Sequence, residues 1–327
     1  LPTHWLSKLH DDSDAVRDTL SFLKRSSILQ GSTDGDKTII HRLQGQVYRE
    51  TYLSNQEKFS EANTNTKTLL NEIDVDQLAN FEQQRQETRN LVEQVGTITS
   101  QDYSRPLFSD PDFAALLATT LRNATDLGMP HLAIALTDSV TRVGDTLGPD
   151  HPSTLTARNN LAGAYQTAGR LDEAIPLYEQ NLEDRTRILG PHHPDTLTAR
   201  NNLAGAYQAA GRLNEAIPLY QQNLKDRTRI LSPHHPDTLN SRNNLANAYH
   251  DAGRLNEAIP LHEQTLEDRT RILGPHHPHT LISRDNLADA YRTAGRIEDA
   301  EKLFETPSDS ENEQDGTEED PDQEAGD

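Results

Sequence analysis

Residues 159–178 read NNLAGAYQTAGRLDEAIPLY, and closely related stretches follow at 201–220, 243–262 and 285–304. The prolines that precede these stretches, Pro152, Pro194, Pro236 and Pro278, are spaced 42 residues apart, and the first two 42-residue units differ at only six positions. A repeat of this length is typical of a chain built from stacked units, each of which buries a small apolar layer against its neighbours.

Each unit predicts two helices separated by a glycine turn. The first helix of the first unit is expected from about 153 to 168, between Pro152, whose missing N–H is tolerated at a helix start, and Gly169 after its end. The second is expected from about 173 to 189, with Pro176 near its first turn. The expected core consists of the apolar residues at helical spacing, namely Leu155, Leu161, Ala162, Tyr165, Ala168, Ala174, Leu177, Tyr178, Leu182 and Ile188.

The composition excludes several classes of protein. Only 33% of the residues are hydrophobic, which is little for one large core but sufficient for many thin layers. The chain has no cysteine, so it offers no disulfide, thiolate metal site or cysteine nucleophile, and it suits a reducing compartment. It shows no long apolar run and no signal peptide, so we expect a cytoplasmic protein without a membrane partner.

The net charge of −21 is unevenly distributed. Residues 306–327 contain ten Asp or Glu and no Lys or Arg, which leaves −11 for the remaining chain. This segment has no apolar periodicity, so we expect a disordered acidic tail. Because an acidic body repels phosphate backbones, nucleic acid is not the expected partner. The sequence carries no signal for an oligomeric state.

The packing residues of the unit carry a family resemblance. Leu161, Ala162, Tyr165, Gly169 and Ala174 stand where tetratricopeptide repeats have their small and large packing residues. The long second helix, the Gly-Pro-x-His-Pro linker and the Asn-Asn pair resemble the kinesin-light-chain type of this repeat. The resemblance implies an all-α, right-handed α-solenoid at 152–305, preceded by a degenerate capping repeat at 110–151 and a helical linker at 54–109.

The resemblance also implies a binding face. In the related family, asparagines on the concave side of the superhelix bond to the main chain of an extended peptide. The matching residues are Asn160, Asn202, Asn244 and Asn286, with Asn159, Asn201 and Asn243 beside them. Asp285 interrupts the second series, which puts peptide contact at the last repeat in doubt. The implied partner is a protein or an extended peptide in this groove.

Two mid-helix glycines favour the same face. Gly163 and Gly205 lie where glycine costs about 0.5–1 kcal/mol relative to alanine, which predicts the close approach of a ligand backbone. Asn247 and Asp289 occupy the equivalent positions in later repeats, so the face becomes more polar and acidic. The alternative is that duplication merely copied these asparagines, and that they cap or solvate a helix surface.

Recurring histidine pairs raise the question of a metal site. Adjacent side chains in a turn point apart, and no third ligand accompanies them at a fixed spacing, so we expect linker residues near helix starts and no metal. These pairs are His192-His193, His234-His235 and His276-His277.

The first fifty residues belong to no repeat. Residues 14–25 predict a helix, 26–30 and 37–41 predict strands around the turn signal Asp34-Gly35, and "LQGQVYRETY" predicts another helix. This order resembles the winged-helix segment of NB-ARC-type signalling NTPases, and we assign residues 1–53 to it. There, a Met-His-Asp motif contacts the β-phosphate of ADP; here His41 matches, while Arg42 replaces the acid.

These observations predict a non-enzymatic binding module at the sensor end of a signalling NTPase whose ATPase domain lies outside this chain. No phosphate-binding loop, nucleophile elbow or zinc-protease motif occurs in the sequence. We therefore expect no cofactor here, and ADP or ATP only with an upstream nucleotide-binding domain. The competing hypothesis is a free-standing scaffold without a nucleotide switch. An unrelated helical adaptor or a DNA-reading winged helix also remain open for the first residues.

Overall fold

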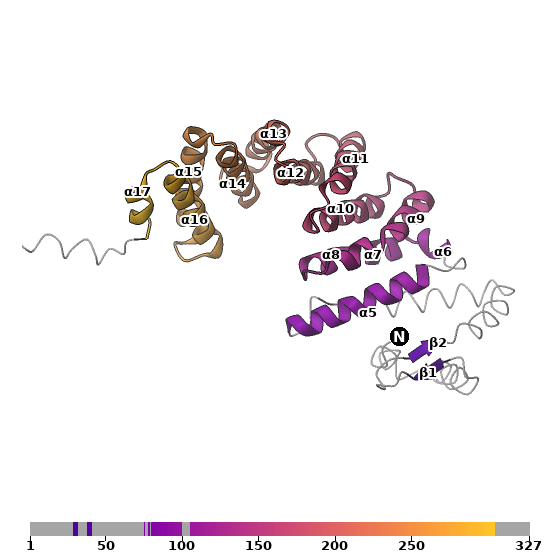
Figure 1. Cartoon of the computed structure of the whole chain (residues 1–327). Coiled ribbons are helices and arrows are strands. Elements are labelled where there is room, and N and C mark those ends of the chain that lie inside the picture. Colours follow the sequence, from indigo (N-terminus) through magenta and orange to yellow (C-terminus); the bar gives the residue numbers. More distant parts are fainter. Residues whose placement is uncertain are drawn as a thin grey trace, which may run out of the picture. The chain divides into compact units, whose positions relative to one another are not determined.

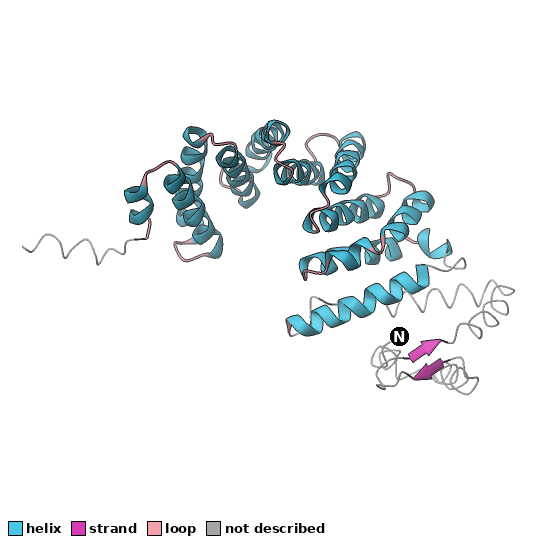
Figure 2. Cartoon of the chain, in the orientation of Figure 1, coloured by secondary structure: helices cyan, strands magenta, loops and turns pink. Residues whose placement is uncertain are grey.

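The computed structural model describes residues 29–31, 38–40, 75, 78, 80–99 and 105–304 (Figure 1). Nearly all of them are helical, apart from two short strands (Figure 2). The chain divides into two compact units, Leu1–Ala199 and Arg200–Asp327. None of the described helices is both long enough and apolar enough to cross a lipid bilayer.

The two described strands form an antiparallel pair and precede helix α5 (Phe81–Thr99) in the chain. Strand β1 (Leu29–Gly31) pairs antiparallel with β2 (Thr38–Ile40), with Leu29 opposite Ile40. Strand β2 lies within the predicted segment 37–41, whereas β1 overlaps only the last two residues of the predicted segment 26–30 and extends one residue beyond it. The flanking helices predicted at 14–25 and from 43 onward, and His41 itself, lie outside the described residues.

Among the described residues, five helices precede the regular repeats. They are α5 (Phe81–Thr99), α6 (Arg105–Phe108), α7 (Pro111–Asp126), α8 (Pro130–Ile134) and α9 (Thr137–Leu147). Helix α5 packs against α7 and α8. The predicted second helix of the degenerate repeat is divided into α8 and α9, because the chain leaves helical geometry at Leu136, which is itself buried.

Four helix pairs then follow, and all of their helices except the last have constant lengths. The first helices have 16 residues each, and they are α10 (Pro152–Thr167), α12 (Pro194–Ala209), α14 (Pro236–Asp251) and α16 (Pro278–Thr293). The second helices are α11 (Leu171–Leu189), α13 (Leu213–Leu231) and α15 (Leu255–Leu273), with 19 residues each, and α17 (Ile297–Lys302), with six. This confirms the predicted all-α solenoid of helix pairs.

Local chemistry sets the ends of the first helices. After α10 the chain turns at Gly169, whose φ of +73° is disfavoured for residues with a side chain. The N–H of Arg170 donates to the carbonyl of Tyr165 at 2.9 Å, and that of Gly169 donates to Gln166 at 2.9 Å. These two bonds form a Schellman motif, which satisfies the last carbonyls of the helix.

The second histidine of each linker caps the helix that follows it. The Nδ1 atom of His193 accepts a bond from the N–H of Asp195 at 3.2 Å, and His235 and His277 repeat this contact at the same distance. In the linker before the first repeat, His151 caps α10 in the same way. The expectation that these histidines are linker residues near helix starts is therefore confirmed for the second member of each pair.

We expect His235→Ala to lower the free energy of unfolding by about 1 kcal/mol, as the loss of other N-caps does. His235→Asn should restore most of the loss, because asparagine also accepts a bond from the backbone. Urea unfolding followed by circular dichroism measures both. His276→Ala, at an exposed first histidine, is the control; equal losses at His235 and His276 would show that capping is not the cause.

Candidate peptide-binding face

The predicted asparagines all lie on the first helices of the repeats. We call the side of α10, α12, α14 and α16 that carries them the asparagine face. Most of these side chains are half-buried, and Asn243 is 8% exposed. The residues of the asparagine face are Asn159, Asn160, Gly163, Asn201, Asn202, Gly205, Asn243, Asn244, Asn247 and Asn286.

The asparagines join successive first helices. In the unit 200–327, Nδ2 of Asn244 donates to Oδ1 of Asn201 at 3.0 Å, and Nδ2 of Asn286 donates to Oδ1 of Asn243 at 3.0 Å. In the unit 1–199, Nδ2 of Asn160 donates to the main-chain carbonyl of Ala118 at 2.8 Å. The asparagines therefore bond one repeat to another, a role that neither the peptide-binding prediction nor its alternative of helix caps and solvated side chains included.

These bonds also fix the orientation of the carboxamides. The contact between Asn244 and Asn201 uses one nitrogen and one oxygen, whereas each asparagine side chain can make up to about four hydrogen bonds. The orientation places the oxygen of Asn244 and the nitrogen of Asn201 away from the shared bond. These two atoms take no part in the bond between the repeats, and they are an acceptor and a donor, the groups that the main chain of an extended peptide can bond.

Gly163 has a close neighbour within its own repeat. A Cβ atom at Gly163 would lie 3.4 Å from the hydroxyl oxygen of Tyr178, which is 4% exposed on the second helix. Burial raises the pKa of Tyr178 to about 12, so this hydroxyl stays neutral. At 3.4 Å a Cβ atom would be in ordinary van der Waals contact with this oxygen, so Tyr178 alone does not explain why a glycine occupies the position.

The third repeat replaces both members of this pair. Asn247 stands at the glycine position, and the smaller ring of His262 stands at the tyrosine position. His262 is 1% exposed, and its Nδ1 atom has no hydrogen-bond partner among the residues that the structure describes. Burial lowers the pKa of His262 to about 4; His250 adds to the shift and Asp289 opposes it.

The asparagine face becomes more acidic in the last two repeats. His250 Nε2 lies 3.7 Å from Oδ2 of Asp289 and 3.1 Å from Oγ1 of Thr293. Asp285 and Asp289 are both exposed. A ligand that extends along α14 and α16 therefore meets carboxylates there, which favours basic side chains at that end.

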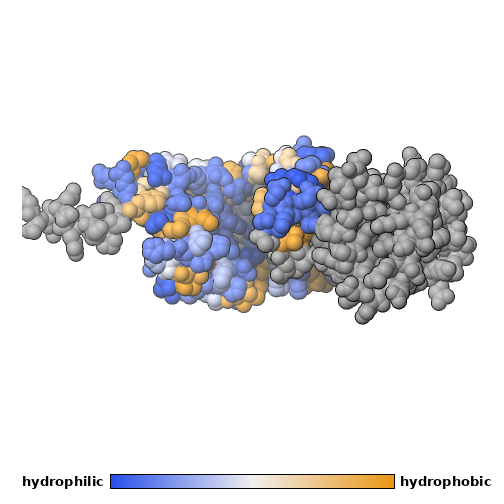
Figure 3. Space-filling model, turned by 90° about the horizontal axis from the view of Figure 1, so that it is seen from below, coloured by the Kyte–Doolittle hydropathy of each residue, from blue (hydrophilic) through white to orange (hydrophobic). Residues whose placement is uncertain are grey.

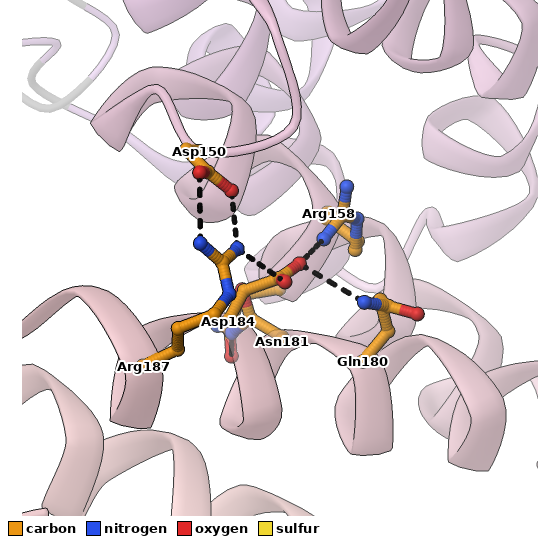
Figure 4. Close-up of polar contacts among 7 residues, drawn as sticks. Asp150, Arg158, Gln180, Asn181, Asp184 and Arg187 are labelled. Carbon is orange, nitrogen blue, oxygen red and sulfur yellow. Dashed lines mark hydrogen bonds and ion pairs between the residues drawn. The ribbon is translucent and has the colours of Figure 1, made fainter.

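Sequence reasoning missed a series of ion pairs between the two helices of each of the first three repeats. Arg158 on α10 bonds to Asp184 on α11 at 2.6 Å, and Arg187 reaches the other oxygen of Asp184 at 3.0 Å. Asp150 in turn binds Arg187 through both oxygens (Figure 4). The later pairs are Arg200–Asp226 at 2.9 Å and Arg242–Asp268 at 2.7 Å.

A second arginine series joins each second helix to the next first helix. Arg269 on α15 donates to Oγ of Ser283 at 2.7 Å and to Oδ1 of Asn240 at 2.6 Å. Burial lowers the pKa of Arg269 from its usual value, but these contacts keep its donors satisfied. The buried pairs could have been predicted from the sequence, because Arg and Asp recur in each of the first three repeats on the side of the helix that faces the core.

The visible face of the described helices is mainly hydrophilic, with separate apolar spots (Figure 3). The exposed apolar side chains include one at the end of each long second helix, namely Ile188, Ile230 and Ile272. The residues of the asparagine face, asparagines and glycines, suit recognition by hydrogen bonds more than the burial of a large apolar ligand.

Comparison with known proteins agrees with this architecture. The tetratricopeptide repeat profile matches residues 117–183, 153–224, 195–270 and 237–306. The nearly identical TPR-like repeats of a kinesin light chain-like protein from Podosopora anserina are 32% identical, cover 64% of this chain and 99% of that chain, and give a TM-score of 0.55. A variant of that protein gives 33% identity, 57% and 89% coverage, and a TM-score of 0.53.

A more distant structure supports the fold alone. BtubC (BKLC) from P. vanneervenii is 21% identical, with 76% of this chain and 98% of that chain covered and a TM-score of 0.54. No curated protein matches the chain at a significant level. The predicted similarity to kinesin-light-chain-like repeats is thus confirmed. Because the profile matches together span 117–306, more than half of the chain, this protein belongs to the tetratricopeptide repeat family.

Proposed function

We propose that this chain is a non-enzymatic module that binds a protein or an extended peptide on its asparagine face. The observation that carries the proposal is the regular series of carboxamides held in fixed orientations by bonds between repeats. Because these groups are pre-oriented, a ligand backbone loses less entropy in binding them. The half-buried positions partly shield the bonds from water, which strengthens them.

A single substitution can separate binding from stability. Asn201→Asp keeps an oxygen to accept the bond from Asn244, but it replaces the outward amide donor with a carboxylate oxygen. Asp285 already occupies the equivalent position in the last repeat, so the helix accepts this residue. Asn244→Ala removes the bond between the repeats instead.

We expect Asn201→Asp to weaken peptide binding about tenfold or more while leaving the fold intact, because one hydrogen bond is lost and its partner stays unsatisfied. Asn244→Ala should weaken binding and also lower the free energy of unfolding by about 1 kcal/mol. The ligands are peptides selected by display against the chain, and fluorescence anisotropy at high salt screens the added charge. Unchanged affinity in Asn201→Asp would refute the assignment of the asparagine face.

At a finer level, we propose that this module is the sensor end of an NB-ARC-type signalling NTPase in the cytoplasm. The hairpin β1–β2 in front of the helices, together with His41 in the matching position, supports this proposal. A ligand on the repeats would change their packing against the first segment and bias the nucleotide state of the upstream domain.

The alternative is a free-standing scaffold that assembles other proteins without a nucleotide switch. The coding sequence upstream of Leu1 distinguishes the two, because the NTPase requires a phosphate-binding loop ahead of this chain. His41 alone does not replace that loop. Titration calorimetry of this chain with ADP should therefore give no tight binding under either proposal, and micromolar one-to-one binding would contradict both.

A further inference from the structure

Among the described residues, the second helix of the fourth repeat is much shorter than those of the other repeats. Its first helix, α16, has the same 16 residues as the others, but α17 has only six residues where α11, α13 and α15 have 19. The part of α16 that faces the second half of a long helix in other repeats therefore lacks that cover among the described residues. We call this surface the open strip, formed by Leu281, Arg284 and Phe304.

In each of the first three repeats, the long second helix covers the corresponding surface of the first helix. In each one, an aspartate near the end of the second helix pairs with an arginine of the first: Asp184 with Arg158, Asp226 with Arg200 and Asp268 with Arg242. Figure 4 shows this pairing in the first repeat. The leucines three residues before those arginines, Leu155, Leu197 and Leu239, are 2–3% exposed.

The same positions are incomplete in the fourth repeat. Arg284 has no carboxylate partner among the described residues, and its buried Nε atom makes no hydrogen bond. Its guanidinium lies 5.1 Å from the ring centre of Phe304 instead. Phe304 is 43% exposed, whereas Tyr178 in the equivalent position is 4% exposed, and Leu281 is only half-buried.

The sequence beyond Phe304 does not continue the pattern. In the 42-residue register, Pro307 stands in place of Asn181, and Ser310 stands in place of Asp184. Proline in a helix interior costs about 3 kcal/mol. The segment 306–327 also contains no Leu, Ile, Val, Met or aromatic residue that could cover the open strip.

We infer that the open strip is a second docking site, distinct from the asparagine face, which accepts an amphipathic helix of a partner protein. The partner helix carries an aspartate or glutamate that pairs with Arg284, and a small residue three positions earlier. This spacing follows Asn181 and Asp184, which belong to the buried side of α11, whereas Phe304 of this chain already stands in place of Tyr178. The inference does not depend on the peptide-binding proposal.

A labelled peptide with the sequence of residues 177–189, LYEQNLEDRTRIL, tests the docking site on the full chain. We expect it to bind, and Arg284→Gln in the protein, or Asp184→Asn within the peptide, to weaken binding at least about tenfold. The two changes together should weaken binding little more than either alone, because they remove the same contact. Independent, additive effects would overturn the pairing.

A graft keeps the test decisive if the short peptide is too weakly helical in solution. Replacing residues 305–315 with the sequence of 179–189 completes the second helix within the chain. We expect the graft to raise Tm by several degrees, and Arg284→Gln in the grafted chain to remove the gain. If neither the peptide binds nor the graft raises Tm, the open strip is not an acceptor for a helix.

Two controls identify the occupant. Removing residues 305–327 should leave the affinity for the peptide unchanged, and a tenfold or larger rise would assign the strip to the chain's own tail instead of a partner. Sedimentation velocity should show no self-association that depends on Arg284. A dimer that Arg284→Gln dissociates would assign the strip to a second copy, and would overturn the inference of a partner helix.

Discussion

Replacing Asp184 with Asn should lower the free energy of unfolding by about 3 kcal/mol, because removal of one partner from a buried ion pair leaves the other charge uncompensated. Two arginines converge on Asp184, at 2.6 and 3.0 Å, and its side chain is 6% exposed. The isosteric amide retains the shape of the carboxylate, so the loss reports charge and hydrogen bonding more than packing.

The matched control is Glu173→Gln in the same helix. Glu173 forms an i,i+3 pair with Arg170, but both side chains are more than 40% exposed, so water screens the interaction. We expect little change there. Urea unfolding followed by circular dichroism measures both variants. The repeats of such an array need not all unfold in one transition. Equal losses at Asp184 and Glu173 would show that burial of the pair does not matter.

The helix pairs could be predicted from the sequence because their limits depend on local chemistry. Pro152 starts α10 as predicted, and Gly169 follows its end with a positive φ. Helix α11 begins at Leu171, two residues before the predicted start, and ends at the predicted Leu189. Proline and glycine act through the backbone of their own residues, so neighbouring helices do not change their effect.

The core was less predictable than the helix limits. Leu155, Leu161, Ala162, Tyr165, Ala174 and Tyr178 are buried as expected. Ala168 is exposed because it lies beyond the last helical residue, and Ile188 is 39% exposed in the last turn of α11. Asp184 and Asn181 are buried instead. The core was predicted from the spacing of apolar residues, and that spacing does not indicate which polar residues are buried.

The candidate site shows the same limit. The positions of the asparagines on one side of the first helices follow from helical spacing. That Asn244 bonds to Asn201 of the preceding repeat depends on how the repeats stack, and the spacing within one helix does not contain that information. Tyr178, the neighbour of Gly163, likewise belongs to another helix. The third repeat changes both positions together, to Asn247 and His262, and this joint change could have indicated the contact.

His262 should make the third repeat sensitive to acid. Its pKa falls from 6.5 to about 4 in the fold, so between these values the unfolded chain binds the proton and the folded chain does not. Stability from this group is thus complete above about pH 6.5 and is lost as the pH falls toward 4, by up to about 3 kcal/mol. His250 and Asp289, the charged groups that act on His262, partly offset each other.

The double variant His262→Tyr/Asn247→Gly restores the pair that the second repeat carries, so it should lose this extra acid sensitivity. The measurement is the fall in Tm from pH 7 to pH 4.5, determined for the double variant and for the original chain. Both proteins contain the same carboxylates, so the effect of carboxylate titration cancels when the two falls in Tm are compared. His262→Tyr alone should be less stable at both pH values, because the tyrosine hydroxyl would meet Asn247 where Gly163 leaves room for Tyr178. An unchanged Tm difference in the double variant would show that protonation of His262 does not destabilise the repeat. A single variant as stable as the double would show that the glycine and the tyrosine are not coupled.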